Sequence, residues 1–89
     1  MAKSLYRTET GVLLALLREF RAKAGLTQAQ CSRALGRPQS FMSDVERGIR
    51  RLDLVQLRDL CQVLGVSLTT LIRHFEARLE LQEKRKSPN

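Results

Sequence analysis

The sequence predicts an all-α fold of five helices, and three observations support that prediction. Apolar residues recur at spacings of three and four along most of the chain, which is the pattern of a helix with one buried face. No segment alternates apolar and polar residues as a half-buried strand would. Aromatic residues are scarce, with three Phe, one Tyr and no Trp, so aliphatic side chains must build most of the core, which suits a helix bundle.

The first helix is predicted over residues 10–24. Its apolar stripe consists of Leu13, Leu16, Leu17 and Phe20. Gly25 follows as a stop, because glycine adopts the left-handed conformation that ends many helices. Residues 1–9 are mostly polar, and we expect them to be a mobile N-terminal segment.

Two shorter helices follow, each with its own start and stop signal. Thr27 and Gln30 have the spacing of a capping box, and Gly36 ends that helix. The next helix is predicted to begin near Pro38, whose missing N–H costs nothing in a first turn, and to end at Gly48. The inward-facing positions of the two helices are Cys31, Leu35, Met42 and Val45.

A fourth and a fifth helix complete the domain. Asp53 and Ser67 are their predicted N-caps, and Gly65 separates them. The fifth helix carries a long apolar stripe that ends with Phe75 and Leu79. We therefore expect one domain over residues 10–80, followed by a charged C-terminal tail over residues 81–89.

The charge of the chain points to a polyanionic partner. Sixteen Lys and Arg residues against nine Asp and Glu give a net charge of +7, which favours nucleic acid. The apolar run 12–17 is too short for a signal peptide, and nothing approaches the length of a membrane span. We expect a cytoplasmic, nucleoid-associated protein with no membrane partner.

Neither catalysis nor metal binding finds support in the sequence. Cys31 and Cys61 lie far apart in apolar helical patterns, and His74 has no ligand partner nearby in the sequence. We expect two core thiols and a surface histidine. Because no constellation of nucleophile, base and phosphate-binding loop is present either, the sequence predicts no enzyme, no cofactor and no metal site.

The segment 25–48 carries most of the functional information. It reads as two short helices joined by a tight turn, a motif whose second helix lies in the DNA major groove. This recognition helix is predicted over residues 38–47. The polar residues that it presents are Gln39, Ser40, Ser43, Asp44 and Arg47.

Residues 28–47 resemble the helix-turn-helix of the lambdoid phage repressors and the wider Xre-type regulators. Gln28 opens the first motif helix, Ser32 is small where the two helices cross, and Gly36 is the turn glycine. The phrase LGVS at 64–67 also recurs in that family, and the likeness spans roughly residues 12–75. The resemblance implies a five-helix, lambda-repressor-like DNA-binding domain.

Two residues depart from the family pattern. Ser32 replaces the usual alanine, and Pro38 stands where the family usually has a capping Ser or Thr. The lost cap predicts that the first amides of the recognition helix are hydrated or bound to phosphate.

Specific contacts can be assigned to several of these residues. Gln39 has the amide that pairs with adenine N6 and N7, and the resemblance implies that Gln28 binds phosphate. Asp44 either accepts from a cytosine amine or is neutralised by Arg47 or Arg37. Phe41 either touches a thymine methyl or, as we favour, covers the edge of the core. The expected phosphate clamps are Arg37, Arg47, Arg50 and Arg51.

The resemblance also implies an ion pair between Arg21 and Glu46 that ties the first helix to the third. Phe75 and Leu79 are expected to continue beyond the body of the domain and to close a homodimer. The alternative is that they fold back onto Leu13, Leu16 or Leu5 of the same chain.

The leading functional hypothesis is a transcriptional regulator that binds a palindromic operator as a homodimer and acts by occluding or recruiting polymerase. One alternative is the antitoxin of a toxin–antitoxin module, although the charged tail is short for masking a toxin. Another is a protein-interaction domain that has lost DNA binding, which Asp44 favours and the arginines oppose.

Overall fold

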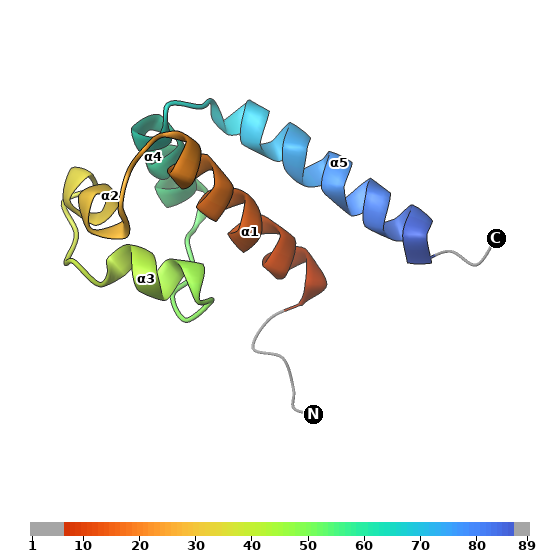
Figure 1. The fold of residues 1–89 in the computed structure, drawn as a ribbon, viewed down its shortest axis with the longest axis horizontal. Helices are drawn as coiled ribbons and strands as arrows, with labels where there is room; N and C mark the ends of the chain where they lie inside the picture. The colour runs from red at the N-terminus through yellow and green to blue at the C-terminus, as the bar shows by residue number, and fades with distance from the viewer. Residues whose placement is uncertain (1–6, 87–89) are drawn as a thin grey trace.

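Within residues 7–86, which the computed structural model describes, the chain forms five helices joined by short turns and has no strand (Figure 1). The predictions for Leu5, for most of the N-terminal segment and for residues 87–89 lie outside the described residues. The all-α prediction is confirmed. The helices are α1 (Thr8–Lys23), α2 (Gln28–Ala34), α3 (Phe41–Glu46), α4 (Leu54–Leu64) and α5 (Leu68–Lys86).

The predicted caps form. The Thr27 hydroxyl accepts from the Gln30 N–H at 3.0 Å, and the Gln30 side chain accepts from the Thr27 N–H at 2.9 Å. Asp53 and Gln56 make the same reciprocal pair at the start of α4. The Ser67 hydroxyl accepts from the backbone of Thr70 at 3.0 Å. These helix starts are therefore fixed by side chains within three residues of them.

Two helix starts differ from the prediction. Helix α1 begins at Thr8, so helical backbone reaches into the segment assigned to the N-terminus. Helix α5 continues through the charged segment to Lys86. Helix α3 begins at Phe41 rather than near Pro38. Its preceding residues form a turn instead, in which the Phe41 N–H donates to the Pro38 carbonyl at 2.9 Å.

The core lies where α1 meets the motif helices and α4. Its fully buried side chains include Leu16, Leu17, Met42 and Leu60. Cys31 and Cys61 are buried free thiols, as expected, and burial raises the pKa of both. Among the described residues, no cluster of three or more His, Cys, Asp and Glu side chains could hold a metal ion. None of the helices within 7–86 combines the length and apolar character needed to cross a membrane.

Helix α5 packs along α1 (Figure 1). The Arg78 guanidinium donates to both carboxylate oxygens of Glu19, at 2.6 and 2.9 Å, and the exposed His74 ring meets Phe20 edge-on at 5.4 Å. Phe75 and Leu79 are consequently half-buried against the core of their own chain. The expectation that both residues extend beyond the body of the domain was therefore wrong, because α5 folds back over α1.

Candidate nucleic-acid interface

The two motif helices present polar side chains on one exposed face. Gln39 and Ser40 are exposed in the turn before α3, and Ser43 follows one turn later on the helix. Together with Gln28 and Ala29 of α2 they line a shallow surface hollow. The structure thus gathers four of the predicted DNA-contact residues, but it places Gln39 and Ser40 ahead of the helix rather than in its first turn.

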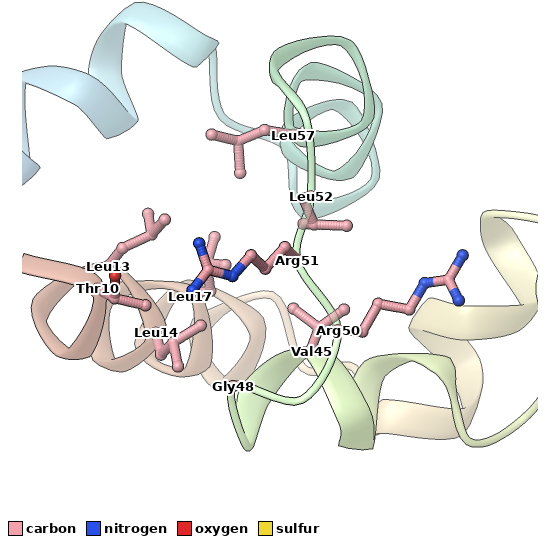
Figure 2. A pocket seen from close by; sticks show the side chains of 10 residues that line it. All are labelled: Thr10, Leu13, Leu14, Leu17, Val45, Gly48, Arg50, Arg51, Leu52 and Leu57. Carbon is pink, nitrogen blue, oxygen red and sulfur yellow. The ribbon is translucent and has the colours of Figure 1, made fainter. Parts of the chain in front are cut away.

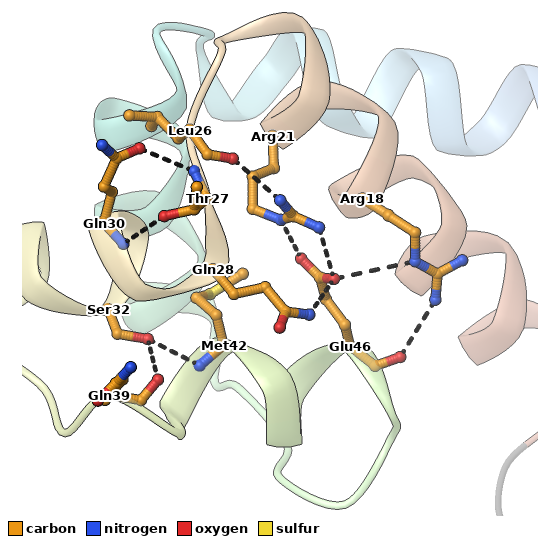
Figure 3. A network of polar contacts seen from close by, with 10 residues as sticks. All are labelled: Arg18, Arg21, Leu26, Thr27, Gln28, Gln30, Ser32, Gln39, Met42 and Glu46. Carbon is orange, nitrogen blue, oxygen red and sulfur yellow. Dashed lines mark hydrogen bonds and ion pairs between the residues drawn. The ribbon is translucent and has the colours of Figure 1, made fainter.

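Ser32 joins α2 to the start of α3 (Figure 3). Its fully buried hydroxyl accepts from the Met42 N–H at 3.0 Å and lies 3.3 Å from the Gln39 carbonyl, to which it donates. Ser40, the N-cap residue of α3, makes no side-chain cap, so a residue of the neighbouring helix supplies it instead. The first amides of the recognition helix were expected to be hydrated or bound to phosphate; those of Phe41 and Met42 instead bond within the chain, to the Pro38 carbonyl and to Ser32.

We expect Ser32→Ala to lower the free energy of unfolding by about 1–3 kcal/mol, because it leaves the buried Met42 N–H without a partner. Thermal or urea unfolding of the purified chain measures this loss. The matched control is Ser40→Ala, which removes the hydroxyl of the N-cap residue of α3; because that side chain makes no capping hydrogen bond, the variant should be nearly as stable as the parent. Equal stability of Ser32→Ala and the parent would show that the interhelical cap contributes nothing.

Glu46 is the centre of a buried polar network that links three helices (Figure 3). Its carboxylate accepts from Arg21 Nε at 2.6 Å and Arg21 Nη2 at 3.1 Å, and also from the Gln28 side chain at 2.9 Å. Arg21 further donates to the Leu26 carbonyl at 2.9 Å. The Glu46 side chain is 3% exposed and that of Arg21 is 16% exposed, so the pair is largely shielded from water.

Arg18 is a member of this network that sequence reasoning missed. Its Nε lies 3.8 Å from Glu46 Oε1, and its Nη2 donates to the Glu46 carbonyl at 3.4 Å. The available signal was its position three residues before Arg21, which places both arginines on one face of α1. Unlike Arg21, Arg18 keeps more than half of its side chain exposed.

The network keeps Glu46 ionised and engages the side-chain amide of Gln28. Burial opposes ionisation of Glu46, but the hydrogen bonds from Arg21 and Gln28 and the charges of Arg21 and Arg18 outweigh it and lower the pKa of the carboxyl. One N–H of the Gln28 amide is thereby committed to Glu46. The network holds α3 against α1 and α2, and it orients the exposed face described above.

The predicted arginine clamps point in different directions. Figure 2 shows the guanidinium of Arg51 lying over a cavity of about 170 Å³ between α1 and the segment that follows α3, whereas that of Arg50 points away from it. Arg50 and Arg37 instead lie over the ring of Phe41. Phe41 itself is buried in the core, which is the alternative that we favoured for it. Arg47 is exposed at the end of α3.

Asp44 remains half-exposed on α3. Within the part of the chain that the structure describes, its carboxylate has neither a hydrogen-bond donor nor a basic residue within ion-pair distance. Neutralisation by Arg47 or Arg37, one of the two alternatives for this residue, is therefore absent from the free protein. Its backbone carbonyl accepts from the N–H groups of Ile49 and Arg50 and helps to end the helix.

Comparisons with known proteins agree with this geometry. A family model described as a helix-turn-helix domain matches residues 12–75. The chain is 38% identical over 52 residues to an uncharacterized HTH-type transcriptional regulator, y4dJ, of Sinorhizobium fredii. The matched segment covers 58% of this chain and 68% of that protein.

Two solved structures are similar over most of the chain. An XRE-family like protein from Pseudomonas syringae superposes with a TM-score of 0.74 at 41% identity, over 79% of this chain and 85% of that one. The clp gene regulator ClgR from Corynebacterium glutamicum superposes with a TM-score of 0.76 at 26% identity, over 90% of this chain and 85% of that one.

Proposed function

The chain belongs to the helix-turn-helix domain family, as a non-enzymatic transcriptional regulator of the XRE type, and from this premise we propose that it binds a specific operator in double-stranded DNA. The turn before α3 and the exposed face of α3 would enter the major groove. The observation that carries the proposal is the exposed polar face itself, on which Gln39, Ser40 and Ser43 lie beside the first residues of α2.

Each part of the interface has a distinct task in this proposal. The Gln39 amide can donate to N7 and accept from N6 of one adenine, and Ser40 and Ser43 can contact base edges beside it. Asp44, which is free of basic partners, is suited to accept from a cytosine amine. The remaining DNA contacts are phosphate contacts, which fix the register of the protein without reading sequence. They are assigned to Gln28, Arg37, Arg47, Arg50 and Arg51.

A binding-site selection from random duplex DNA tests the proposal directly. Enrichment of one recurring sequence by the parent chain supports operator binding. Retention of all duplexes alike, with no enriched sequence, would overturn specific recognition.

We expect Gln39→Ala to weaken binding to the selected site by about 1–3 kcal/mol and to leave binding to random duplex nearly unchanged, because only base contacts discriminate between sequences. Fluorescence anisotropy with both duplexes measures the two losses. Gln30→Ala is a suitable control, because that side chain belongs to the capping box of α2 rather than to the hollow. Equal losses on both duplexes would remove Gln39 from the base contacts.

We further propose that the active species is a homodimer on a palindromic operator. One recognition helix reads too few base pairs to select a genomic site, and two-fold symmetry would place two such helices about one helical turn apart. Phe75 and Leu79 keep partly exposed edges, and Ile72, which is 40% exposed, lies on the same flank of α5. This apolar stripe is the proposed interface, and its placement would set the half-site spacing.

We expect Ile72→Asp to convert the dimer into a monomer in analytical ultracentrifugation at micromolar concentration, because it buries a charge in an apolar interface. Ile72 is substituted rather than Leu79 because Leu79 also packs against the core of its own chain. Leu81→Asp is the control on α5, since Leu81 is 59% exposed and lies on a different face. Val55 of α4 is 70% exposed, and Val55→Asp tests whether α4 forms the dimer interface instead. A parent that is already monomeric, or a dimer that only Val55→Asp dissociates, would contradict the α5 interface.

The proposed site of action is the cytoplasm, at a promoter. Operator occupancy would then either exclude polymerase or recruit it. A promoter–reporter assay with the selected operator distinguishes these outcomes by the sign of the change in expression.

A further inference from the structure

Two arginines from opposite ends of α3 lie over one aromatic ring. The guanidinium carbon of Arg37 is 5.3 Å from the centroid of the Phe41 ring, and that of Arg50 is 5.2 Å from it. Arg37 belongs to the turn before α3 and Arg50 to the segment after it. Because Phe41 is buried in the core at 6% exposure, its ring is a fixed surface for both side chains.

The geometry lies within the range of cation–π attraction, in which a guanidinium is within about 6 Å of the ring centroid. The two guanidinium carbons are no more than 10.5 Å apart, the sum of their distances to the centroid. Among the described residues neither arginine forms an ion pair. Asp59 of α4 borders the same small depression as Arg37 and Phe41 but lies beyond ion-pair distance of Arg37. No described carboxylate therefore neutralises the two positive charges.

We propose that Phe41 is a positioning residue that holds Arg37 and Arg50 as a pair to bind phosphate groups of the DNA backbone. The proposal rests on the proposed function and deepens it. Phosphate is the fitting ligand because a guanidinium presents a planar fork of donors to its oxygens. The depression beside Arg37 and Phe41 is lined partly by α4 residues, whereas the hollow that contains Gln39 includes residues of α2. The pair therefore flanks the base-reading face.

Holding both arginines on the ring also lowers the entropy cost of binding. A free arginine side chain must give up several rotamers when it meets a phosphate, and a stacked one has already lost part of that freedom. Phe41 thus contributes to affinity for any duplex, although it is buried and need not touch DNA itself.

The decisive experiment replaces Phe41 alone with phenylalanines carrying one, three and five ring fluorines. Each added fluorine weakens the negative electrostatic potential of the ring face, and the shape of the side chain is largely preserved. Affinity for the selected site and for random duplex should fall stepwise and in parallel, by roughly five- to thirtyfold at five fluorines. In an Arg37→Met/Arg50→Met background the same series should have no effect.

Two controls separate positioning from stability. The same series at Phe20, which is buried in the core and meets His74 rather than an arginine, should leave DNA affinity unchanged. Unfolding midpoints recorded for every variant identify any loss that follows from damage to the core. If fluorination at Phe41 lowers only the midpoint, or leaves affinity unchanged, the ring serves the core alone and the proposal is wrong.

A second probe distinguishes this proposal from the proposed function. Inorganic pyrophosphate is titrated into the free protein at low ionic strength while the side-chain Nε–H signals of Arg37 and Arg50 are followed by NMR. Shifts that weaken as Phe41 is fluorinated support the pair, even if no duplex binds and operator recognition fails. Duplex binding that is insensitive to the ring, with no pyrophosphate shift, overturns the pair and leaves the proposed function standing.

Discussion

Replacing Arg21 with Met is expected to lower the free energy of unfolding by about 3–5 kcal/mol, because it removes one partner of a buried ion pair. Glu46 would keep only Gln28 and the more distant Arg18, and its carboxylate is 3% exposed and cannot reach water. A small domain has a total stability of about 5–15 kcal/mol, so this loss is a large part of it. Urea unfolding of parent and variant measures the difference.

Removing the other partner of the ion pair should lower the free energy of unfolding by less. Glu46→Met strands Arg21, but Arg21 is 16% exposed and its long side chain can carry the charge to the surface. The pair Arg21→Met/Glu46→Met completes a double-mutant cycle and should be more stable than Arg21→Met alone. Additive losses in this cycle would contradict a direct interaction between the two side chains.

The pH dependence of folding stability tests the same ion pair independently. The pKa of Glu46 is lowered in the folded chain, so its ionised form contributes stability above the pKa of the unfolded state, about 4.3 for a glutamate. That contribution is lost as the pH falls from there through the folded pKa. The stability of Glu46→Gln should therefore depend less on pH than that of the parent across this range. Equal acid sensitivity of the two proteins would assign the effect to other carboxylates.

The sequence predicts the features of this fold that depend on neighbouring residues. The capping box of Thr27 and Gln30 and the glycine at the end of α4 act over three or four residues, and their geometry is that of any helix end. The helix stripes follow in the same way from a fixed period. The positions of Gln39, Ser40 and Ser43 on one exposed face follow from the family motif.

The missed features join residues that belong to different elements of the fold. The Ser32 cap of α3 and the position of Phe41 beneath Arg37 and Arg50 both depend on how closely α2, α3 and the segment after α3 approach one another. The packing of α5 against α1 brings together Arg78 and Glu19, which are 59 residues apart. Periodicity carries no information about such pairs. Even the ion pair of Arg21 was indicated only by the family resemblance.

Binding should be strongly salt-dependent, and the arginines after α3 should account for a measurable part of that dependence. Each phosphate that the protein neutralises contributes about −0.9 to the slope of log K against log salt concentration. We expect Arg50→Ala/Arg51→Ala to flatten the slope by about one to two units for each subunit engaged. One unit of slope corresponds to about a fourfold change in affinity between 50 and 200 mM salt.

The structure predicts how this effect divides between the two arginines. Arg50 is held on the Phe41 ring, so Arg50→Ala should flatten the slope by nearly one unit, whereas the guanidinium of Arg51 lies over the cavity beside α1 and should contribute less. Arg78→Ala removes the same charge from a residue paired with Glu19 and should leave the slope unchanged. Because phosphate contacts do not read sequence, the arginine variants should lose affinity for selected and random duplex alike, unlike Gln39→Ala. A slope that the double variant does not change would exclude both arginines from the interface.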